Sequence, residues 1–387
     1  MNNIEQVKNC VGCRLCEKIC PNNSIKMIYD KEGFLVPKVN HNSCLNCGVC
    51  LEKCCQNKSE KVSKIEKIYA ARIKQDDANL KNSTSGGAFY LLAKYVLENN
   101  GVVFGATYNE NLEVVHSIIH REEEIYKLQG SKYVQSDPLN TYEIAKEYLD
   151  KGVMVLYAGT PCQVAALKRY LSADCLNLVT IDLVCFGVPS PGLFKSYLKW
   201  LENKNKCKIK KYSFRKNYWG LQYRSEIEDE NSNKILLSPN DPYIIGFTRK
   251  KFHRKCCYDC KYKSDYRVGD ITLGDYWGIQ KIFPKLLDGE GVSRIFINTK
   301  KGEDIFEFVR KDMNIYYSTD SLESDFFQEK SNNCLEEREK IYDDYRDEDY
   351  FDTRLKFRTN LKSLIFSRLP QRSQLIRKRI SAMFGKR

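Results

Sequence analysis

Two cysteine motifs near the N-terminus constrain the fold of this chain more than any other feature. Each motif has the form C-x2-C-x2-C-x3-C, and together they contain Cys10, Cys13, Cys16, Cys20, Cys44, Cys47, Cys50 and Cys54. Three thiolates at steps of three residues wrap around one cuboidal cluster, and the fourth cysteine of each motif binds the other cluster. The sequence therefore predicts two interleaved 4Fe-4S clusters.

The ligand sets follow from this exchange of fourth cysteines. The first cluster is expected to use Cys10, Cys13, Cys16 and Cys54, and the second to use Cys44, Cys47, Cys50 and Cys20. Structural zinc is the alternative, but it usually takes two cysteine pairs with a spacer between them, which fits a doubled eight-cysteine motif poorly. Cys55 stands where a bacterial ferredoxin usually has proline, so the choice between Cys54 and Cys55 as ligand stays open. Residues 1–56 are thus expected to form a two-cluster ferredoxin-type domain.

The number of cysteines also bears on the compartment. The chain has 387 residues and 17 cysteines, a content that would suggest disulfides in a small secreted domain. Nine of them, however, fall within residues 10–55 at metal-ligand spacing, and the first ten residues contain no apolar signal core. No apolar run approaches the roughly 18 residues of a membrane span. We therefore expect a cytoplasmic protein.

The net charge of +13 is concentrated at one end of the chain. Residues 354–387 contain eleven Lys and Arg and no Asp or Glu, which leaves +2 for the rest. A short amphipathic basic helix in this tail could make a peripheral contact with an anionic membrane. The tail shows no motif that positions nucleic-acid bases, so no nucleic acid is expected as a partner.

Hydrophobic patterning divides the remainder of the chain. Residues 57–67 are a polar linker, and strand and helix patterns alternate from residue 68 until strand patterns dominate after about residue 206. Helices are expected over 86–101, 141–152, 162–171 and 191–202, and strands over 102–108, 153–159 and 178–185. This predicts an α+β protein with a mixed-sheet α/β domain over residues 68–330. Residues 331–387 are an acidic, then basic and partly helical C-terminal extension.

Four cysteines outside the first domain suggest a further metal site. Cys162 and Cys185 each follow a predicted strand, and Cys257 and Cys260 form a C-x2-C pair. Neighbouring strand ends can converge, so the four thiols can act together as soft ligands of a third cluster. Cys256 adjoins Cys257 and could replace it. Buried, inert thiols are the alternative.

A small-residue loop suggests a phosphate site. In "NSTSGGAF", Asn82 to Phe89, hydroxyl residues and two glycines lead into a helix, whose exposed N–H groups suit a phosphate. An ordinary Ser or Thr N-cap fits the same pattern. Neither G-x-G-x-x-G nor a P-loop motif is present.

Seven motifs together resemble a known family. They are "STSGGAF", "GSKYVQS", "GTPCQVAAL", "DLVCFGVPS", "FRKNYWG", "CYDCKYK" and "GDITLGDYWG". Their order over roughly residues 5–330 is similar to that of the beta subunit of coenzyme F420 hydrogenase and dehydrogenase, in which a fused ferredoxin module is common. The resemblance implies a flavoprotein oxidoreductase that passes electrons between 4Fe-4S clusters, FAD and an acceptor, either coenzyme F420-like or a polysaccharide-biosynthesis intermediate. No catalytic residue is identified.

For FAD we expect contacts from eight residues of two of these motifs. They are Ser83, Thr84, Ser85, Gly86, Gly87, Ser131, Lys132 and Gln135. An electron-transfer adaptor that docks onto a larger redox enzyme, without an organic substrate of its own, fits the same features. The expected partner is accordingly a redox protein or a small-molecule acceptor.

Overall fold

The computed structural model describes most of the chain. It covers residues 2–57, 62–74, 82–172, 174–218, 221–238, 240–279, 282–286, 291–319, 335–343, 345–347 and 350–353. The basic tail, for which the sequence predicts a helix and a membrane contact, lies outside these residues. Among the residues covered, no helix combines the length and the apolar character that crossing a bilayer requires.

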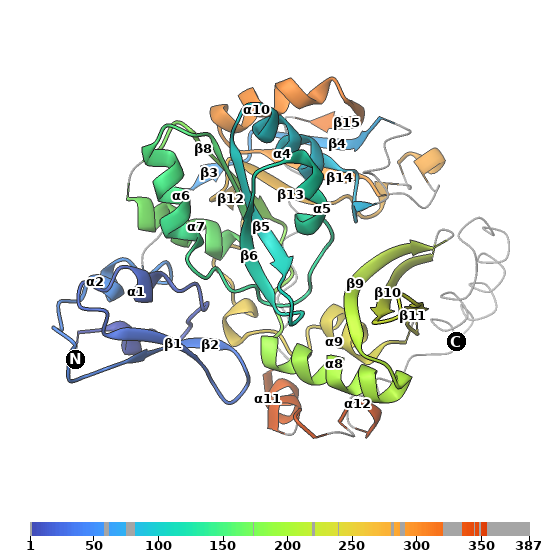
Figure 1. Ribbon diagram of the computed structural model, residues 1–387. Helices are drawn as coiled ribbons and strands as arrows, with labels where there is room; N and C mark the ends of the chain where they lie inside the picture. The colour runs from blue at the N-terminus through green and yellow to red at the C-terminus, as the bar shows by residue number, and fades with distance from the viewer. Residues whose placement is uncertain are drawn as a thin grey trace, which may run out of the picture.

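An eight-stranded mixed sheet forms the centre of the molecule (Figure 1). In spatial order its strands are β15 (Met313–Thr319), β4 (Lys67–Ile73), β14 (Ser293–Ile297), β13 (Ile271–Asp275), β8 (Leu178–Leu183), β7 (Val155–Gly159), β5 (Val102–Tyr108) and β6 (Val114–Ile119). β13, β8, β7 and β5 are parallel to one another, and the other pairings are antiparallel. Four neighbouring strands therefore end at one edge of the sheet, which is where open α/β sheets bind ligands.

Helices cover both faces of this sheet (Figure 1). One face packs against α4 (Ala88–Glu98), α5 (Ile125–Leu128) and α10 (Lys300–Arg310), and the other against α6 (Thr141–Asp150) and α7 (Pro161–Leu171). α4 forms because apolar residues recur at helical spacing, and Leu92, Ala93 and Val96 are fully buried. α7 begins at Pro161 because Thr160 and Gln163 form a capping box. The predicted alternation of helices and strands in this region is confirmed.

A second, aromatic-rich unit lies beside the central sheet. It contains a separate antiparallel sheet of β9 (Ile209–Tyr218), β10 (Leu221–Asp229) and β11 (Lys234–Leu236), together with α8 (Pro191–Asn205), α9 (Pro242–Thr248), α11 (Leu335–Asp343) and α12 (Tyr350–Thr353). The strands after residue 206 were expected to continue one mixed sheet, but these three do not, whereas β13, β14 and β15 do. The edges of the central sheet are occupied by β15 and β6, so the β9–β10 hairpin buries Tyr212 and Phe214 against α8 instead.

The N-terminal residues form a small unit below α6 and α7 (Figure 1). It contains the hairpin β1 (Ile25–Tyr29) and β2 (Leu35–Val39) and the one-turn helices α1 (Leu15–Lys18) and α2 (Val49–Glu52). Each helix follows a residue in the left-handed conformation, Arg14 at φ 60° and Gly48 at φ 75°, so the chain turns sharply beside the cysteines. β3 (Ser63–Lys64), inside the predicted linker, pairs with β12 (Tyr266–Arg267) and so joins the two parts.

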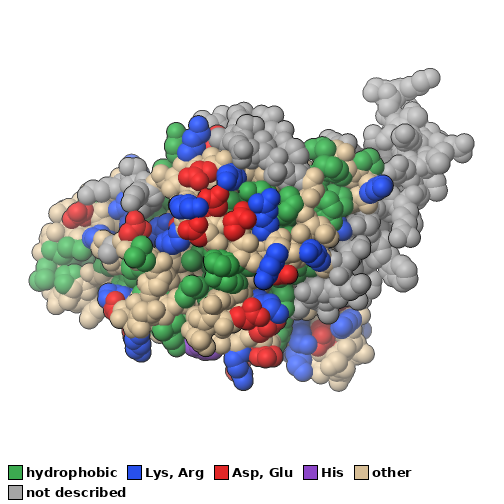
Figure 2. Space-filling model, turned by 90° about the horizontal axis from the view of Figure 1, so that it is seen from above, with side chains coloured by type: hydrophobic (Ala, Val, Ile, Leu, Met, Phe, Trp, Pro, Cys, Tyr) green, Lys and Arg blue, Asp and Glu red, His purple; other side chains and the backbone are tan. Residues whose placement is uncertain are grey.

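Charges are interspersed over the face of the molecule that Figure 2 shows. Lys and Arg side chains there lie among Asp and Glu side chains rather than in one patch of a single sign. This mixture agrees with the nearly balanced charge of the first 353 residues. Exposed ion pairs of this kind each contribute only about 0–1 kcal/mol to stability.

Candidate metal centres and cofactor loop

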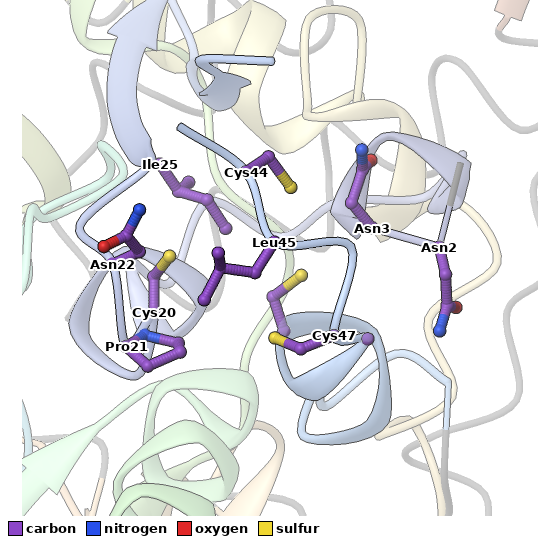
Figure 3. Close-up of a pocket in the computed structure, with 11 residues that line it drawn as sticks. Asn2, Asn3, Cys20, Pro21, Asn22, Ile25, Cys44, Leu45 and Cys47 are labelled. Carbon is purple, nitrogen blue, oxygen red and sulfur yellow. The ribbon is translucent and has the colours of Figure 1, made fainter. Parts of the chain in front are cut away.

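The second predicted ligand set lines one pocket. Cys20, Cys44, Cys47 and Cys50 border a space of about 320 Å³, part of which is open to solvent (Figure 3). Leu45 in its wall is 66% exposed, and Cys47 is exposed as well. The backbone N–H of Ser24 donates to the Cys20 Sγ at 3.2 Å, a bond that would stabilise a thiolate. The pocket therefore lies at the outer surface of the N-terminal unit.

The first predicted ligand set lies deeper. Cys13 and Cys16 are buried, and the backbone N–H of Gly12 donates to the Cys10 Sγ at 3.3 Å. Burial raises the pKa of Cys16 well above its usual value, and the charges of Cys10, Cys54 and Cys50 raise it further. Cys16 thus lies near two thiols of its own expected set and near Cys50 of the other.

Cys55 adds a fifth thiol beside this set. It is fully buried, and its Sγ lies 3.9 Å from that of Cys13. The thiols of Cys54 and Cys55 hydrogen-bond to each other, and the pKa of Cys55 is raised by its bond to Cys13, by burial and by the charge of Cys162. Both neighbours thus border the first site, and Cys55 also faces the main domain.

The four remaining predicted ligands meet at the carboxyl edge of the sheet. Cys162 lies in the first turn of α7, directly after β7, and Cys185 follows β8, the parallel neighbour of β7. Burial raises the pKa of the Cys162 thiol, and the charges of the other three thiols raise it further. Cys185 keeps access to solvent, but the protein atoms around its thiol raise the pKa to about 12, with Cys257 the next contributor. The thiols from three separate segments are therefore close enough to interact.

Cys257 rather than Cys256 is turned toward this group. Both lie in the single 3-10 turn Lys255–Cys257, and their thiols interact with each other. Of the cysteines in this segment, Cys257 and Cys260 contribute to the raised pKa of Cys162 and Cys185. In the described ranges, no three His, Cys, Asp or Glu side chains come as close together as the shell of one metal ion requires. Four thiols that lie further apart are still compatible with a 4Fe-4S cluster, because its ligands bind different irons.

Two buried arginines accompany these thiols. Arg267 is 2% exposed and pairs with the fully buried Asp182 at 2.9 Å, and its charge lowers the pKa of Cys185 and Cys260. Arg254 does the same for Cys257. Because four thiolates around an iron-sulfur core leave a net negative charge, buried cations nearby favour the deprotonated ligands that a cluster needs.

Arg254 also ties this region to the N-terminal unit. Its guanidinium donates to the carbonyl oxygen of Cys10 at 2.6 Å, to that of Leu35 at 2.8 Å and to the Gln135 Oε1 at 2.9 Å. Gly12 has φ +69°, and a Cβ there would lie 2.8 Å from the Arg254 Nη1. The close approach therefore depends on a glycine in the first motif.

Gln135, predicted to contact flavin, lies at this interface instead of beside the small-residue loop. Its Nε2 donates to the carbonyl oxygen of Val11 at 2.9 Å, and its Oε1 accepts from Arg254. The side chain is 5% exposed. Both of its polar groups thus bind the N-terminal unit and the cysteine region.

Two tyrosines close the space between the first and third thiol sets. The Tyr142 hydroxyl donates to the carbonyl oxygen of Cys13 at 3.0 Å, and the Tyr262 hydroxyl donates to that of Cys55 at 2.9 Å. Both rings belong to one apolar cluster that also holds Cys162 and Cys260. One hydrophobic core therefore connects Cys13 of the first set with Cys162 and Cys260 of the third.

The predicted phosphate loop brings part of the expected flavin set together. The hydroxyls of Thr84 and Ser131 are 3.0 Å apart, and the Gln129 Nε2 donates to the Ser83 Oγ at 3.1 Å. Gly87 precedes α4 at φ +83°, and no described side chain caps this end of the helix. N–H groups at such an end can bind a phosphate.

Ser85 and Gly86 serve the packing of the sheet. The Ser85 hydroxyl donates to the carbonyl oxygen of Val292 at 3.0 Å. A Cβ at Gly86 would lie 2.3 Å from the carbonyl oxygen of Ala71 and 2.5 Å from the backbone nitrogen of Ser293. A larger residue at Gly86 would therefore disturb β4 and β14 before it affected any bound phosphate.

Lys132 is turned toward backbone carbonyls. Its Nζ donates to the oxygen of Gln129 at 2.8 Å, and to those of Leu128 and Gly130 at 3.3 and 3.2 Å. Burial lowers its pKa to about 7. These bonds satisfy the carbonyls at the end of α5 and occupy the ammonium group that was expected to contact FAD.

Sequence reasoning did not single out Tyr133 or Arg215. Tyr133 hydrogen-bonds to Ser131 and to Arg215, and Arg215 forms an ion pair with Asp275. The Arg215 guanidinium also lies 5.6 Å from the ring centre of Trp277, which is 44% exposed. The motifs "FRKNYWG" and "GDYWG" contained the signal. Trp219, from the first of these motifs, lies outside the described residues.

Two family models match this chain. Residues 153–321 match the C-terminal region of the coenzyme F420 hydrogenase/dehydrogenase beta subunit, and residues 9–58 match a 4Fe-4S dicluster domain. The second match spans both N-terminal cysteine motifs.

Similar proteins occur among methanogens. One subunit of the F420H2 dehydrogenase of Methanosarcina mazei is 24% identical over 327 residues, which are 79% of this chain and 84% of that protein. The coenzyme F420-dependent sulfite reductase of Methanocaldococcus jannaschii is 24% identical over 317 residues, 79% of this chain and 46% of that protein. A chain of the F420-reducing NiFe hydrogenase complex of Methanosarcina barkeri, solved as a xenon derivative, has 18% identity and a TM-score of 0.46, covering 74% of this chain and 90% of that one.

Proposed function

We infer that this chain, which belongs over residues 153–321 to the coenzyme F420 hydrogenase/dehydrogenase beta-subunit family, carries single electrons through three 4Fe-4S clusters to a flavin. One observation supports this most strongly. Cys13 of the first motif, together with Cys55, shares an apolar core with Cys162 and Cys260, two of the four cysteines at the sheet edge. Two redox centres in one hydrophobic core, joined by Arg254, suit the transfer of electrons between them.

The exposure of the sites gives the relay an order. The second site opens to solvent beside Leu45, Cys13 of the first site packs against the main domain, and the third site lies at the carboxyl edge of the sheet, where Cys185 is exposed. Electrons would therefore be exchanged with an external partner at the second cluster and pass inward through the first to the third.

A flavin site fits beside the inner end of this relay. FAD, when bound, supplies the junction between one-electron carriers and a two-electron acceptor. Thr84, Ser131 and the first turn of α4 would hold its phosphate. Tyr133 hydrogen-bonds to both Ser131 and Arg215, so Arg215 and the exposed ring of Trp277 lie near this phosphate site. Trp277 follows β13, which is the parallel neighbour of β8, the strand that leads to Cys185. The acceptor would be coenzyme F420 or a comparable organic molecule.

Anaerobic purification followed by iron, sulfide and cofactor analysis tests this function. We expect about twelve irons per chain, since three cubane clusters hold four each, and one extractable FAD. About eight irons after anaerobic reconstitution would contradict the third cluster. Complete absence of flavin after reconstitution with FAD would contradict the flavin site.

A second function, an electron-transfer adaptor without its own substrate, is favoured by one comparison. The relative from Methanosarcina mazei is by name a subunit of a dehydrogenase. Reduction of the flavin in the isolated chain by a small-molecule donor would support the enzyme. Reduction that occurs only after a partner protein is added would support the adaptor.

A double substitution of Thr84 and Ser131 should lower the flavin content. Thr84→Val with Ser131→Ala removes two facing hydroxyls without disturbing the sheet, in contrast to a change at Gly86. Each lost hydrogen bond to a charged phosphate corresponds to about 1.5–3 kcal/mol, so we expect FAD affinity to fall at least tenfold while the iron content stays unchanged. Titration with FAD measures this. Thr248→Val, an exposed threonine on α9, is the control, and unaltered affinity in the double variant would remove the loop from the site.

A further inference from the structure

His253 is a buried side chain whose polar atoms have no partner among the described residues. It is 1% exposed, and neither ring nitrogen makes a hydrogen bond to any described residue. Buried polar atoms are hydrogen-bonded in the great majority of cases, and an exception calls for a missing partner such as a water, an ion or a cofactor. The surroundings of the ring indicate which of these partners applies.

Aromatic side chains fix the orientation of the ring. Phe247 stacks on it at 5.0 Å and an angle of 24°, and Phe186 and Tyr258 approach edge-on at 5.8 and 6.3 Å. These neighbours present ring carbons to the imidazole. They therefore hold it in place without satisfying its nitrogens.

One edge of the imidazole ring faces the third thiol set. A Cβ placed at Gly187 would lie 2.3 Å from the His253 Cδ2 and 3.1 Å from the Cys257 Cβ, so the imidazole and the cysteine flank the same glycine. The backbone nitrogen of Gly187 itself donates to the Cys185 Sγ at 3.4 Å. The ring edge that carries Cδ2 and the adjacent Nε2 thus faces the loop that holds Cys185.

We propose that His253 donates its ring N–H to a sulfur of the third cluster and thereby raises the reduction potential of that cluster. The proposal rests on the proposed function, because it needs the cluster on Cys162, Cys185, Cys257 and Cys260. This hydrogen bond would satisfy the one ring nitrogen that carries hydrogen in a neutral imidazole.

The sign of the effect follows from charge. When a 4Fe-4S cluster accepts one electron, its net negative charge grows by one, and a fixed N–H donor stabilises the more negative state more strongly. Hydrogen bonds to cluster sulfurs are accordingly one of the factors that set such potentials. His253 would make the third cluster easier to reduce and so favour inward electron flow from the first cluster.

A redox titration of the full chain, reconstituted anaerobically and followed by electron paramagnetic resonance, tests the proposal. The third cluster is identified by the signal that disappears in the double variant Cys257→Ser, Cys260→Ser. His253→Phe keeps an aromatic ring and removes the N–H. We expect its ratio of reduced to oxidised third cluster at a fixed potential to fall at least tenfold, which is 59 mV for a one-electron couple. The signals of the N-terminal clusters should not shift.

Two companion variants separate the hydrogen bond from packing. His253→Gln retains an N–H donor and should recover part of the shift. Phe247→Leu alters the stacked ring and leaves the donor in place, so its potential should stay close to that of the unmodified chain. An unchanged potential in His253→Phe with full iron content would overturn the proposal while leaving the three-cluster function intact. About eight irons in the unmodified chain would instead overturn both.

A measurement on the unmodified sequence covers the case in which His253→Phe loses the cluster. With histidine labelled by nitrogen-15, pulsed electron paramagnetic resonance of the reduced third cluster should detect a weak nitrogen coupling. That coupling should persist in His116→Asn, because the nitrogens of His116 are already bonded to Ser136 and Ala158. Absence of any histidine coupling would overturn the proposal.

Discussion

Replacing Cys257 and Cys260 by serine should remove about four of about twelve irons from the protein. Serine cannot replace thiolate as a soft ligand, and the two residues supply half of the third set. Reduction of the flavin through the N-terminal clusters should then stop, while those clusters keep their own signals. Iron and sulfide analysis together with stopped-flow reduction measures both effects.

Two single variants sharpen this experiment. Cys207→Ser changes a cysteine in the other part of the molecule, beside the aromatic-rich core, and should leave the iron content unchanged. Cys256→Ser should also leave it unchanged, because Cys257 is the neighbour turned toward Cys162. A full complement of iron in the double variant would show that the four thiols are not ligands.

Arg254→Met should loosen the attachment of the N-terminal unit to the main domain. The substitution keeps much of the apolar stem but leaves the carbonyl oxygens of Cys10 and Leu35 and the Gln135 Oε1 without their donors. Each buried acceptor left unsatisfied costs about 1–3 kcal/mol. We therefore expect a loss of roughly 3 kcal/mol or more in the free energy of unfolding, and slower electron transfer from the first cluster to the third.

Denaturant unfolding of the cluster-loaded protein gives the free energy, and stopped-flow reduction gives the rate. Lys53→Met is a control, because Lys53 also donates across this interface, to the Ser172 Oγ at 2.8 Å, but at the exposed surface. Its effect should stay below about 1 kcal/mol. Equal losses in the two variants would mean that Arg254 has no special part in the attachment.

The sequence predicted those features that depend on local spacing. Three cysteines at steps of three residues specify a cluster loop wherever the rest of the chain lies, and the alternation between Val153 and Asn205 reports helices and strands directly. The meeting of Cys162 with Cys185 was also within reach. Because β7 and β8 are consecutive strands in an α/β pattern, their carboxyl ends lie at one edge.

Contacts between distant segments were beyond such reasoning. Gln135 reads as part of a flavin motif, yet its partners Val11 and Arg254 are more than a hundred residues away in each direction. Gly86 reads as a phosphate-loop glycine, but the approach of β4 and β14 explains it. Neither partner leaves a trace in the local pattern, since only the packing of the two domains brings them together.

The difference in exposure between Cys13 and the second site bears on how the protein acquires its iron. Tyr142 and Tyr262 bond to the backbone of Cys13 and Cys55, whose thiols lie in a hydrophobic core shared with the main domain. Leu45 and Cys47 at the second site are exposed instead. A protein that delivers iron and sulfide should therefore reach the first site more easily before the N-terminal unit docks, whereas it can reach the second site before or after docking.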